Sequence, residues 1–313
     1  MTFVRTVTGD IPPADLGITS CHDHLLWRPP AELAGDDPDL GLTDKEAARK
    51  ELEHFRQAAG QSLVEMTTVE LARDPEGLRL LSKESGIQIV AATGYNKARF
   101  SHEVVTHRSS KSLAQEMIED LTKGMQGTHI QAGVIKAATS LESANSSERK
   151  VIEAVGLAHR QTGAPVSTHT EAGTFVLEQI DLLEDAGVAL NKALIGHLDR
   201  KLEFEYHLQI AQRGVYMGFD QIGKAKYAPD ELRADLIARL VQRGHGEQIL
   251  LGMDIARKSG WPSNGFAYGP GLTQLLWSFL PRLRRKGLSE AEITTLVIDN
   301  PARWLAFKER HRG

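Results

Sequence analysis

The sequence predicts an α/β protein, a (β/α)8 TIM barrel formed by residues 1–313 as a single domain. Apolar stretches rich in Val and Ile alternate with helical patterns from one end of the chain to the other. Short strands of this kind, without strict alternation of polar and apolar residues, are typical of a parallel sheet covered by helices. Strand followed by helix, repeated eight times, is the pattern of the (β/α)8 barrel.

Eight apolar stretches are expected to form the strands. An open, doubly wound sheet would produce the same alternation, but it favours a glycine-rich phosphate-binding turn after the first strand. The turn after the first stretch reads His22-Asp23-His24 instead. The predicted strands are Gly17–Cys21, Ser62–Met66, Ile87–Thr93, Ile130–Lys136, Pro165–His169, Ala193–His197, Gly214–Phe219 and Gln248–Asp254.

Helical patterns fill the segments between these strands, with capping residues where helices should begin and end. Thr43-Asp44 and Ser146-Ser147 each precede an acidic first turn, as N-caps do. Gly86 and Gly163 follow helical patterns, where a left-handed residue commonly ends a helix. The clearest predicted helices are Asp44–Ala59, Ser112–Gly124, Ser147–Gln161, Thr174–Asp185 and Pro229–Arg243.

The composition indicates a globular protein of ordinary charge. The chain has 313 residues, of which 41% are hydrophobic and 25% are charged, with a net charge of −4. This balance gives no reason to expect binding to nucleic acid or to an acidic membrane, and no stretch approaches the roughly 20 apolar residues of a membrane span. The single cysteine, Cys21, excludes an internal disulfide. The N-terminal residues do not resemble a signal peptide, so we expect a cytoplasmic protein.

Histidines end or follow several of the predicted strands. His22 and His24 are two positions apart, which in a strand places both side chains on one face. His169 and His197 end the fifth and sixth strands. Each histidine alone is equally well explained as an exposed polar residue or a packed core residue. Barrel enzymes keep their chemistry at this end of the strands, however, so the joint order favours a metal site.

Lys136 and Asp254 end the fourth and eighth predicted strands. A buried ammonium is costly without a partner, and a lysine at the end of a strand commonly extends toward solvent instead. Asp254 alone would also suit a helix N-cap. Cys21, beside His22, is expected to face away from the barrel interior and to serve packing.

Together, these residues and their neighbours resemble the phosphotriesterase family of the amidohydrolase superfamily. The resemblance implies two divalent metal ions, commonly zinc, although Mn, Co or Fe suit the same ligands. It assigns His22, His24 and Asp254 to one ion and His169 and His197 to the other. Lys136, carboxylated at N6, would bridge the two ions and so become an anionic ligand. The matching strings are His22-Asp23-His24-Leu25, Gly133-Val134-Ile135-Lys136-Ala137-Ala138-Thr139-Ser140, Thr168-His169-Thr170, Gly196-His197-Leu198-Asp199, Gly252-Met253-Asp254 and Asn300-Pro301-Ala302-Arg303.

The chemistry expected from this resemblance is metal-dependent hydrolysis. Two cations roughly 3.5–4 Å apart share a hydroxide and lower the pKa of its parent water. That hydroxide is expected to attack a carbonyl carbon or a phosphorus, while the second ion stabilises the developing charge. The family assigns the proton shuttle to the residue that matches Asp254. Members are often homodimers, so the resemblance allows a homodimer.

Three loops that follow strands carry the remaining information about the substrate. They contain a single acid, Asp220, and a cluster of basic side chains suits a phosphate or carboxylate. Basic loops are also commonly just solvated. The six basic residues are Lys97, Arg99, Lys224, Lys226, Arg257 and Lys258.

Two of these loops resemble those of the phosphorylated sugar-lactone lactonases in the same family. The matching strings are Gly223-Lys224-Ala225-Lys226-Tyr227 and Asp254-Ile255-Ala256-Arg257-Lys258. The resemblance implies that the enzyme opens a phosphorylated furanose lactone. Lys226, Tyr227 and Arg257 would then contact the phosphate, with Lys224, Tyr95 and Asn96 as further substrate contacts.

Two alternatives stay open at this point. The first is a lactonase for acyl-homoserine lactones with side activity on organophosphate triesters, as in an aryldialkylphosphatase. Such a substrate favours apolar loops, for which Phe100, Trp261 and Phe266 are the main candidates. The second is a barrel that binds metal or ligand without catalysis, in which Asp254 would have no reason to lie beside the metals.

Overall fold

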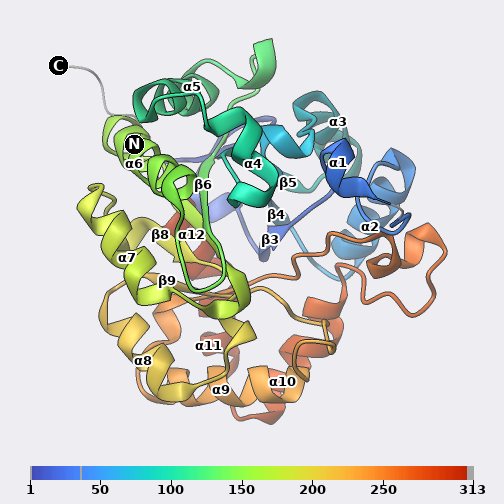
Figure 1. Ribbon diagram of the computed structural model, residues 1–313. Coiled ribbons are helices and arrows are strands. Elements are labelled where there is room, and N and C mark those ends of the chain that lie inside the picture. Colours follow the sequence, from blue (N-terminus) through green and yellow to red (C-terminus); the bar gives the residue numbers. More distant parts are fainter. Residues whose placement is uncertain (1, 36, 309–313) are drawn as a thin grey trace.

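The computed structural model, which describes residues 2–35 and 37–308, has parallel strands at its centre with helices around them (Figure 1). Each strand of the eight-stranded sheet pairs in parallel with the next strand along the chain. This confirms the predicted barrel and excludes the doubly wound alternative, because a doubly wound sheet reverses its strand order. The barrel strands are β3 (Thr19–Asp23), β4 (Ser62–Glu65), β5 (Gln88–Gly94), β6 (Val134–Thr139), β7 (Val166–Thr170), β8 (Ala193–Ile195), β9 (Tyr216–Phe219) and β10 (Ile249–Leu251).

Helices connect the strands and cover the outside of the barrel (Figure 1). A short antiparallel hairpin, β1 (Val4–Thr6) and β2 (Gly9–Ile11), precedes the first barrel strand. The helices are α1 (Ala31–Ala34), α2 (Lys45–Gln57), α3 (Pro75–Ser85), α4 (Ala98–Val105), α5 (Ser110–Thr122), α6 (Ser146–Thr162), α7 (Val176–Asp185), α8 (Phe204–Gln212), α9 (Asp230–Gln242), α10 (Leu280–Arg285), α11 (Glu290–Thr294) and α12 (Asn300–Leu305).

The helix ends show why the sequence forms these elements. Asp44 caps α2 as predicted, because its carboxylate accepts from the amides of Glu46 and Ala47. The N-cap of α6 is Asn145, and the prediction of Ser146-Ser147 was wrong. Asn145 forms a reciprocal capping box with Glu148, which a serine one position later does not replace.

The barrel closes where its first and last strands meet. The backbone amides of Met253 and Asp254 both donate to the carbonyl oxygen of His22, at 3.2 and 2.8 Å. Residues just after β10 are therefore tied to the C-terminal end of β3. Two residues predicted to bind one metal ion, His22 and Asp254, thus also take part in closing the barrel.

The barrel interior below the ligand residues is filled by apolar side chains. Cys21 is buried in this cluster with Val64, Val90 and Val134, so the expectation that it faces away from the interior was wrong. The pairing of β3 with β4 shifts register between Ser20 and Asp23, and such a bulge breaks the alternation of side chains along a strand. Packing is still the role of Cys21.

Three predicted strand ends differ from the observed ones. Strand β6 begins at Val134 and continues to Thr139, so Lys136 lies inside a strand and not at its end. Strands β8 and β10 stop before His197 and Asp254, which have left-handed φ values of 62° and 44°. Residues other than glycine rarely adopt this conformation, and it occurs most often where function requires a particular side-chain direction.

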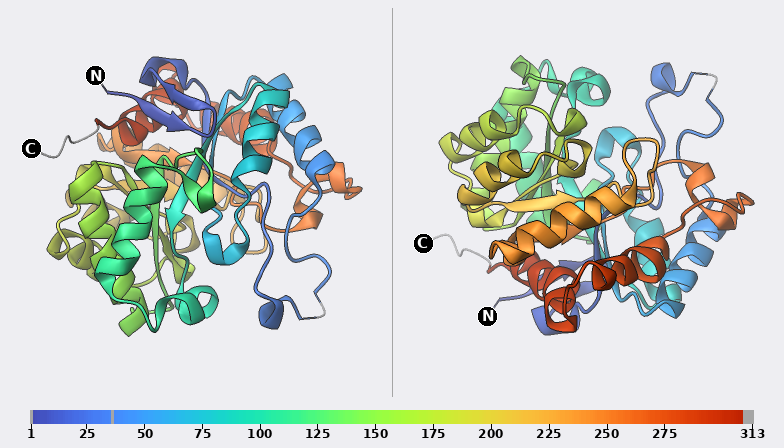
Figure 2. Two further views of the ribbon diagram at one scale, coloured as in Figure 1. Left: turned by 90° about the horizontal axis from the view of Figure 1, so that it is seen from above. Right: turned by 90° about the horizontal axis from the view of Figure 1, so that it is seen from below.

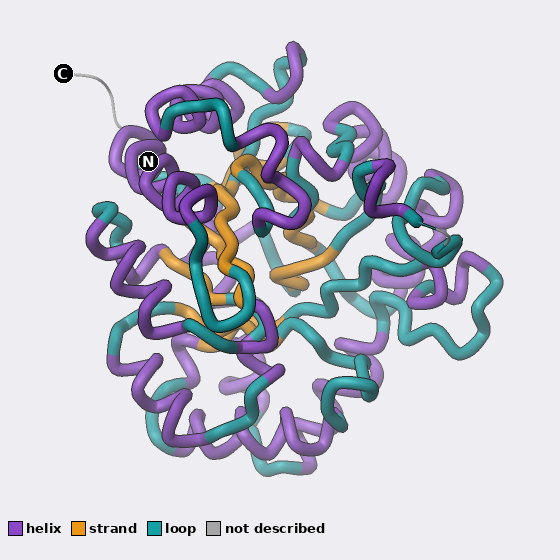
Figure 3. The backbone as a smooth tube through the Cα atoms, viewed as in Figure 1, coloured by secondary structure: helices purple, strands orange, loops and turns teal. Residues whose placement is uncertain are grey.

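The loops at the C-terminal ends of β3 and β10 are long and irregular (Figure 3). They are joined by backbone and side-chain hydrogen bonds between residues 37–40 and 257–259. The two ends of the chain also meet. Phe3 and Phe307 exchange backbone hydrogen bonds, which places the β1–β2 hairpin beside α12 (Figure 2). Among the described residues, no helix is long and apolar enough to cross a membrane.

Candidate metal centre

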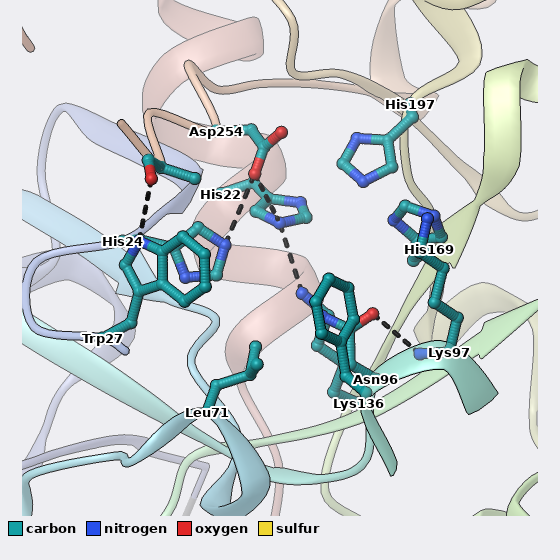
Figure 4. Close-up of a pocket in the computed structure, with 12 residues that line it drawn as sticks. His22, His24, Trp27, Leu71, Asn96, Lys97, Lys136, His169, His197 and Asp254 are labelled. Carbon is teal, nitrogen blue, oxygen red and sulfur yellow. Dashed lines mark hydrogen bonds and ion pairs between the residues drawn. The ribbon is translucent and has the colours of Figure 1, made fainter. Parts of the chain in front are cut away.

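The predicted ligand residues line one pocket at the C-terminal ends of the barrel strands (Figure 4). They come from five different strands or the loops that follow them, which is what the common edge of a parallel barrel makes possible. The pocket is lined by His22, His24, Lys136, His169, His197 and Asp254, together with Trp27, Leu71, Asn96, Lys97, Phe100 and Ala256.

His22, His24 and Asp254 form the first group of ligand atoms. The Nε2 atoms of His22 and His24 lie 3.6 and 3.4 Å from the same oxygen of Asp254, Oδ1. One nitrogen or oxygen from each residue falls within 4.8 Å of the others, a spacing that one cation can span. Burial and the neighbouring Lys136 ammonium lower the pKa of His22 to about 4, so its ring is neutral at pH 7.

His169 and His197 form the second group. Their ring centroids are 4.5 Å apart, and the ring of His197 is 4.9 Å from that of His22. Burial, followed by the charge of His197, lowers the pKa of His169 to about 3. Burial opposes protonation of His197 as well, but the carboxylate of Asp220 outweighs it and raises the pKa of that ring.

Lys136 connects to the first group from β6. Its Nζ lies 3.4 Å from His22 Nε2 and 3.3 Å from the carbonyl oxygen of Met66. The side chain is buried, and burial lowers the pKa of its ammonium. Throughout residues 2–35 and 37–308, no carboxylate forms an ion pair with it. A buried lysine left without a counter-charge is costly, so this position demands a further partner or a neutral amine.

Asp220, which the sequence analysis treated only as an isolated acid, organises the centre from below. Its buried carboxylate accepts hydrogen bonds from Nδ1 of His22 at 2.9 Å and from Nδ1 of His197 at 2.6 Å. It also accepts from the amide of His197. Both rings therefore donate through Nδ1, which leaves Nε2 as the nitrogen available to the pocket. A carboxylate immediately after the strand that ends at Phe219 was the signal that could have identified it.

His24 is oriented by a second relay that the sequence analysis missed. Its Nδ1 donates to Thr67 Oγ1 at 2.8 Å, and this hydroxyl donates to Glu65 Oε1 at 2.5 Å. Glu65 is fully buried and also accepts from the amides of Leu25 and Thr67. Like Asp220, this relay engages Nδ1 and leaves Nε2 as the nitrogen available to the pocket. Glu65 and Thr67 follow no recognisable spacing, so only the folded barrel brings them to His24.

Asp254 has two further polar partners on its outer side. Lys224 Nζ lies 2.7 Å from Asp254 Oδ2 and also donates to the Asp254 carbonyl oxygen. Gln221 Nε2 donates to the same carboxylate oxygen at 2.7 Å. Burial opposes ionisation of Asp254, but Lys224 and the nearby histidines hold its pKa well below the usual range. The Oδ2 atom is thus engaged by these partners, and Oδ1 faces His22 and His24.

The other predicted substrate contacts lie in different places. Asn96 lines the pocket, whereas the Tyr95 hydroxyl donates to Glu116 and accepts from Arg108, away from it. Lys226 and Tyr227 are exposed and do not line the pocket; the ammonium of Lys226 lies over the ring of Tyr227.

Arg257 also lies outside the pocket lining. Its guanidinium pairs with Asp37 at 2.8 Å and with Asp39 at 3.3 Å, so the structure places it between two loops.

The donor set fits divalent ions. Two imidazole nitrogens and a carboxylate oxygen converge in one group, and two further imidazoles lie beside it. Hydrogen-bonded carboxylates fix the ring directions, as they do around protein-bound zinc and similar metals. Lys136 lies beside this group without a carboxylate partner among the described residues. An anionic group there would offset the free-energy cost of burying its ammonium.

The sequence pattern of the phosphotriesterase family matches residues 2–305. The chain belongs to the phosphotriesterase family. Enzymes of this family use a binuclear divalent metal site, and the barrel brings together a cluster of His and Asp side chains that could hold a metal ion. The six residues to which the resemblance assigns metal binding are thus brought together in one pocket by the barrel.

Relatives of known name come from the same family. The phosphotriesterase homology protein of Escherichia coli is 36% identical over 291 residues, covering 92% of this chain and 97% of that protein. A phospho-furanose lactonase of Mycoplasmopsis synoviae is 30% identical over 328 residues, covering 98% of this chain and 93% of that protein. The crystal structure of a lactonase from Listeria monocytogenes has a TM-score of 0.94 and 35% identity, covering 98% of this chain and 100% of that chain.

These matches identify the chain as a phosphotriesterase-family hydrolase that acts on ester bonds, of the lactonase and phosphotriesterase-like kind. They do not name its substrate, because the relatives act on different compounds. They also do not identify which loop residues contact a phosphate.

Replacing Asp220 by asparagine is expected to weaken binding of divalent ions by about 10- to 100-fold, the usual cost of losing a group that orients metal ligands. The amide cannot accept from both His22 and His197 with a full negative charge, so the two Nδ1–H groups lose their common acceptor. Titration with Co²⁺ followed by visible absorption measures the effect. Asp185→Asn, an exposed change at the end of α7, is the matched control. Unchanged Co²⁺ affinity in Asp220→Asn would contradict the orienting role.

Proposed function

We propose that this protein is a lactonase that holds two divalent metal ions and opens a small furanose lactone bearing a phosphate. The observation that carries the lactonase proposal is the convergence of six ligand residues in one pocket of a barrel that matches a lactonase structure over its full length. When bound, the two ions would activate water and polarise the carbonyl oxygen of the lactone.

The ligands divide between the ions as the resemblance implies. His22, His24 and Asp254 would hold one ion, and His169 and His197 the other. Zinc suits this donor set, as do Mn, Co and Fe. Because burial depresses its pKa, Lys136 has access to the neutral amine that reacts with CO2, and the resulting carbamate would bridge the ions. Carboxylation would also remove the cost of the unpaired ammonium.

Asp254 is the proposed proton shuttle. In lactone opening, the oxygen of water bonds to the carbonyl carbon, the ring C–O bond breaks, and the ring oxygen leaves with a proton. Asp254 lies at the pocket beside His22 and His24, so its carboxylate is placed to take a proton from water and pass it to the leaving oxygen. Lys224 and Gln221 hold the carboxylate in position from the other side.

The phosphate part of the proposal is supported by the similarity to phospho-furanose lactonase and by the basic rim. Lys226 and Tyr227 are exposed on the loop that follows β9, and within the described part of the chain no carboxylate pairs with Lys226. They are the proposed phosphate contacts, with Lys224 and Asn96 as further substrate contacts; the Tyr95 hydroxyl, held by Glu116 and Arg108, would have to leave those partners to join them. Arg257 would join them only by leaving Asp37 and Asp39.

A second candidate substrate is a neutral lactone with an apolar substituent, such as an acyl-homoserine lactone, with side activity on organophosphate triesters. The observation that favours it is the apolar wall of the pocket, formed by Trp27, Leu71, Phe100 and Ala256. In addition, the pocket lysine Lys97 is already paired with Glu171.

A substrate comparison separates these candidates. Metal-loaded protein is assayed with a phosphorylated furanose lactone, the same lactone without phosphate, a long-chain acyl-homoserine lactone and an aryl phosphotriester. The proposal expects the highest kcat/KM for the phosphorylated lactone. A higher kcat/KM for the acyl-homoserine lactone would replace it with the second candidate. No turnover of any compound by protein that binds two ions would favour a binding barrel without catalysis.

Lys226→Ala tests the phosphate contact directly. It is expected to raise KM for the phosphorylated lactone by about 10-fold, the equivalent of one charge-assisted hydrogen bond. The KM for the unphosphorylated lactone should stay unchanged, because that substrate has no group for the ammonium to hold. Lys111→Ala, an exposed change on α5, is the control. Equal effects of Lys226→Ala on the two lactones would remove Lys226 from this role.

A further inference from the structure

Of the four histidines that line the pocket, three have a hydrogen-bond partner on Nδ1 and one, His169, has its partner on Nε2. His22 and His197 place Nδ1 against Asp220, and His24 places Nδ1 against Thr67. His169 differs, because its Nε2 lies 3.4 Å from Oε2 of Glu171. The atom left for a cation is therefore Nδ1 in His169 and Nε2 in the other three.

Glu171 begins the turn that follows β7 and has a second partner in Lys97. The ammonium of Lys97, on the loop after β5, pairs with the same oxygen of Glu171 that faces His169. The Lys97 side chain is 15% exposed and that of Glu171 31%, so both are partly screened from solvent at the pocket edge. Figure 4 shows Lys97 and His169 on the same side of the pocket.

The backbone around Glu171 is fixed, which gives its side chain a defined origin. The Glu171 carbonyl oxygen accepts from both the amide and the hydroxyl of Thr174. The same hydroxyl accepts from the amide of Glu142, on the loop after β6. Ala172, the next residue, has a left-handed φ of 53°. This turn is therefore held in one conformation by a neighbouring loop.

We propose that Glu171 is a positioning residue for the second metal ion: it holds the proton of His169 on Nε2 and thereby leaves the Nδ1 lone pair for the ion. Lys97 fixes the Glu171 carboxylate in this role by pairing with it. The inference rests on the proposed function in one respect, namely that His169 and His197 hold a divalent ion.

A purely structural role would behave differently. An ion pair with this degree of exposure contributes little to stability. If Glu171 served only that purpose, its removal would lower the melting temperature slightly and leave the metal sites alone. If Glu171 orients His169, its removal lowers the affinity for the second ion. The affinity for the first ion stays the same, because His22, His24 and Asp254 have orienting partners of their own.

Co²⁺ binding to the full chain tests the inference. Wild-type protein, Glu171→Ala and Glu171→Gln are titrated with Co²⁺ and followed by visible absorption, with bound metal counted by mass spectrometry. Glu171→Ala is expected to lower the affinity of one of the two ions by about 10- to 100-fold. Glu171→Gln retains an oxygen acceptor, so it should recover most of that loss. Glu178→Ala, an exposed change on α7, should match wild type.

Two outcomes are distinguishable. Wild-type affinity for both ions in Glu171→Ala overturns the positioning role and leaves the proposed function intact. Fewer than two ions bound by wild-type protein overturns the dinuclear proposal itself, and with it this inference.

A second measurement does not depend on any variant folding. The ring nitrogens of His169 in ¹⁵N-labelled wild-type protein, observed by NMR before metal loading, report the tautomer. A proton on Nε2 is expected. A proton on Nδ1 would overturn the inference.

Discussion

Replacing Lys136 by methionine is expected to lower kcat/KM for the lactone substrate by about 10²- to 10³-fold or more, the scale of losing a group that stabilises developing charge. Methionine fills similar space in the buried position but offers neither an amine to carboxylate nor an anionic ligand. Bound divalent ions should fall from two per chain toward one or fewer. The folding stability of the metal-free protein should hold or rise, because the ammonium 3.4 Å from His22 is removed.

Metal analysis, steady-state kinetics and thermal unfolding of the Lys136→Met variant measure these effects together. Lys123→Met, a change in an exposed lysine at the end of α5, is the matched control. Two tightly bound ions and wild-type turnover in Lys136→Met would contradict the bridging role. A stable fold combined with lost metal separates a missing ligand from a damaged barrel.

Changing Asp254 to asparagine is expected to lower kcat by about 10³-fold, within the range for loss of a general acid–base group. Asparagine retains the size of the side chain and an oxygen for Lys224, but it cannot exchange a proton near neutral pH. The KM should change much less than kcat, since Asp254 is not a proposed contact for the phosphate. Metal content decides between its two roles, because loss of an ion would assign the effect to ligation.

The kinetics of Asp254→Asn are measured with Co²⁺ at saturating concentration, so that a weakened site is refilled. Full activity under these conditions would remove Asp254 from proton transfer. A loss of kcat with two ions still bound would support it.

The sequence was sufficient to predict the barrel because the fold depends on local patterns, and the resemblance to the phosphotriesterase family named six residues that the barrel brings to one pocket. Apolar runs of strand length, separated by helices, imply parallel strands, and parallel strands bring their C-terminal ends to one edge. His22, His169 and Asp254 could therefore be placed together although they are far apart in the chain. Whether Lys136 is carboxylated depends on the neutral amine and CO2, which no pattern of residues encodes.

The partners of the ligand residues could not be predicted in the same way. Arg257 looked like a free cation in a basic loop, yet it pairs with Asp37 and Asp39, more than two hundred residues earlier. Lys97 likewise pairs with Glu171. These contacts depend on the paths of irregular loops and on side-chain direction, neither of which has a sequence period.

Strand boundaries were the other weak point. Lys136 lies in the middle of β6 because Ala138 and Thr139 continue to pair with His169 and Thr170. Asp254 lies beyond β10, which ends at Leu251, and Asp254 itself has a left-handed backbone conformation. Hydrophobicity does not report either event, since buried residues continue on both sides of each boundary.

Closure of the barrel has a consequence for how this protein responds to metal. The amide of Asp254 bonds to the carbonyl of His22, and the side chains of the same two residues share the first group of ligand atoms. An ion bound there would act as a clasp across the seam between the first and last strands. Metal binding would then add to the free energy of unfolding, and this added stability would grow with the logarithm of the free metal concentration. Depletion of metal would then lower the stability of the contact between β3 and β10 and would also abolish activity.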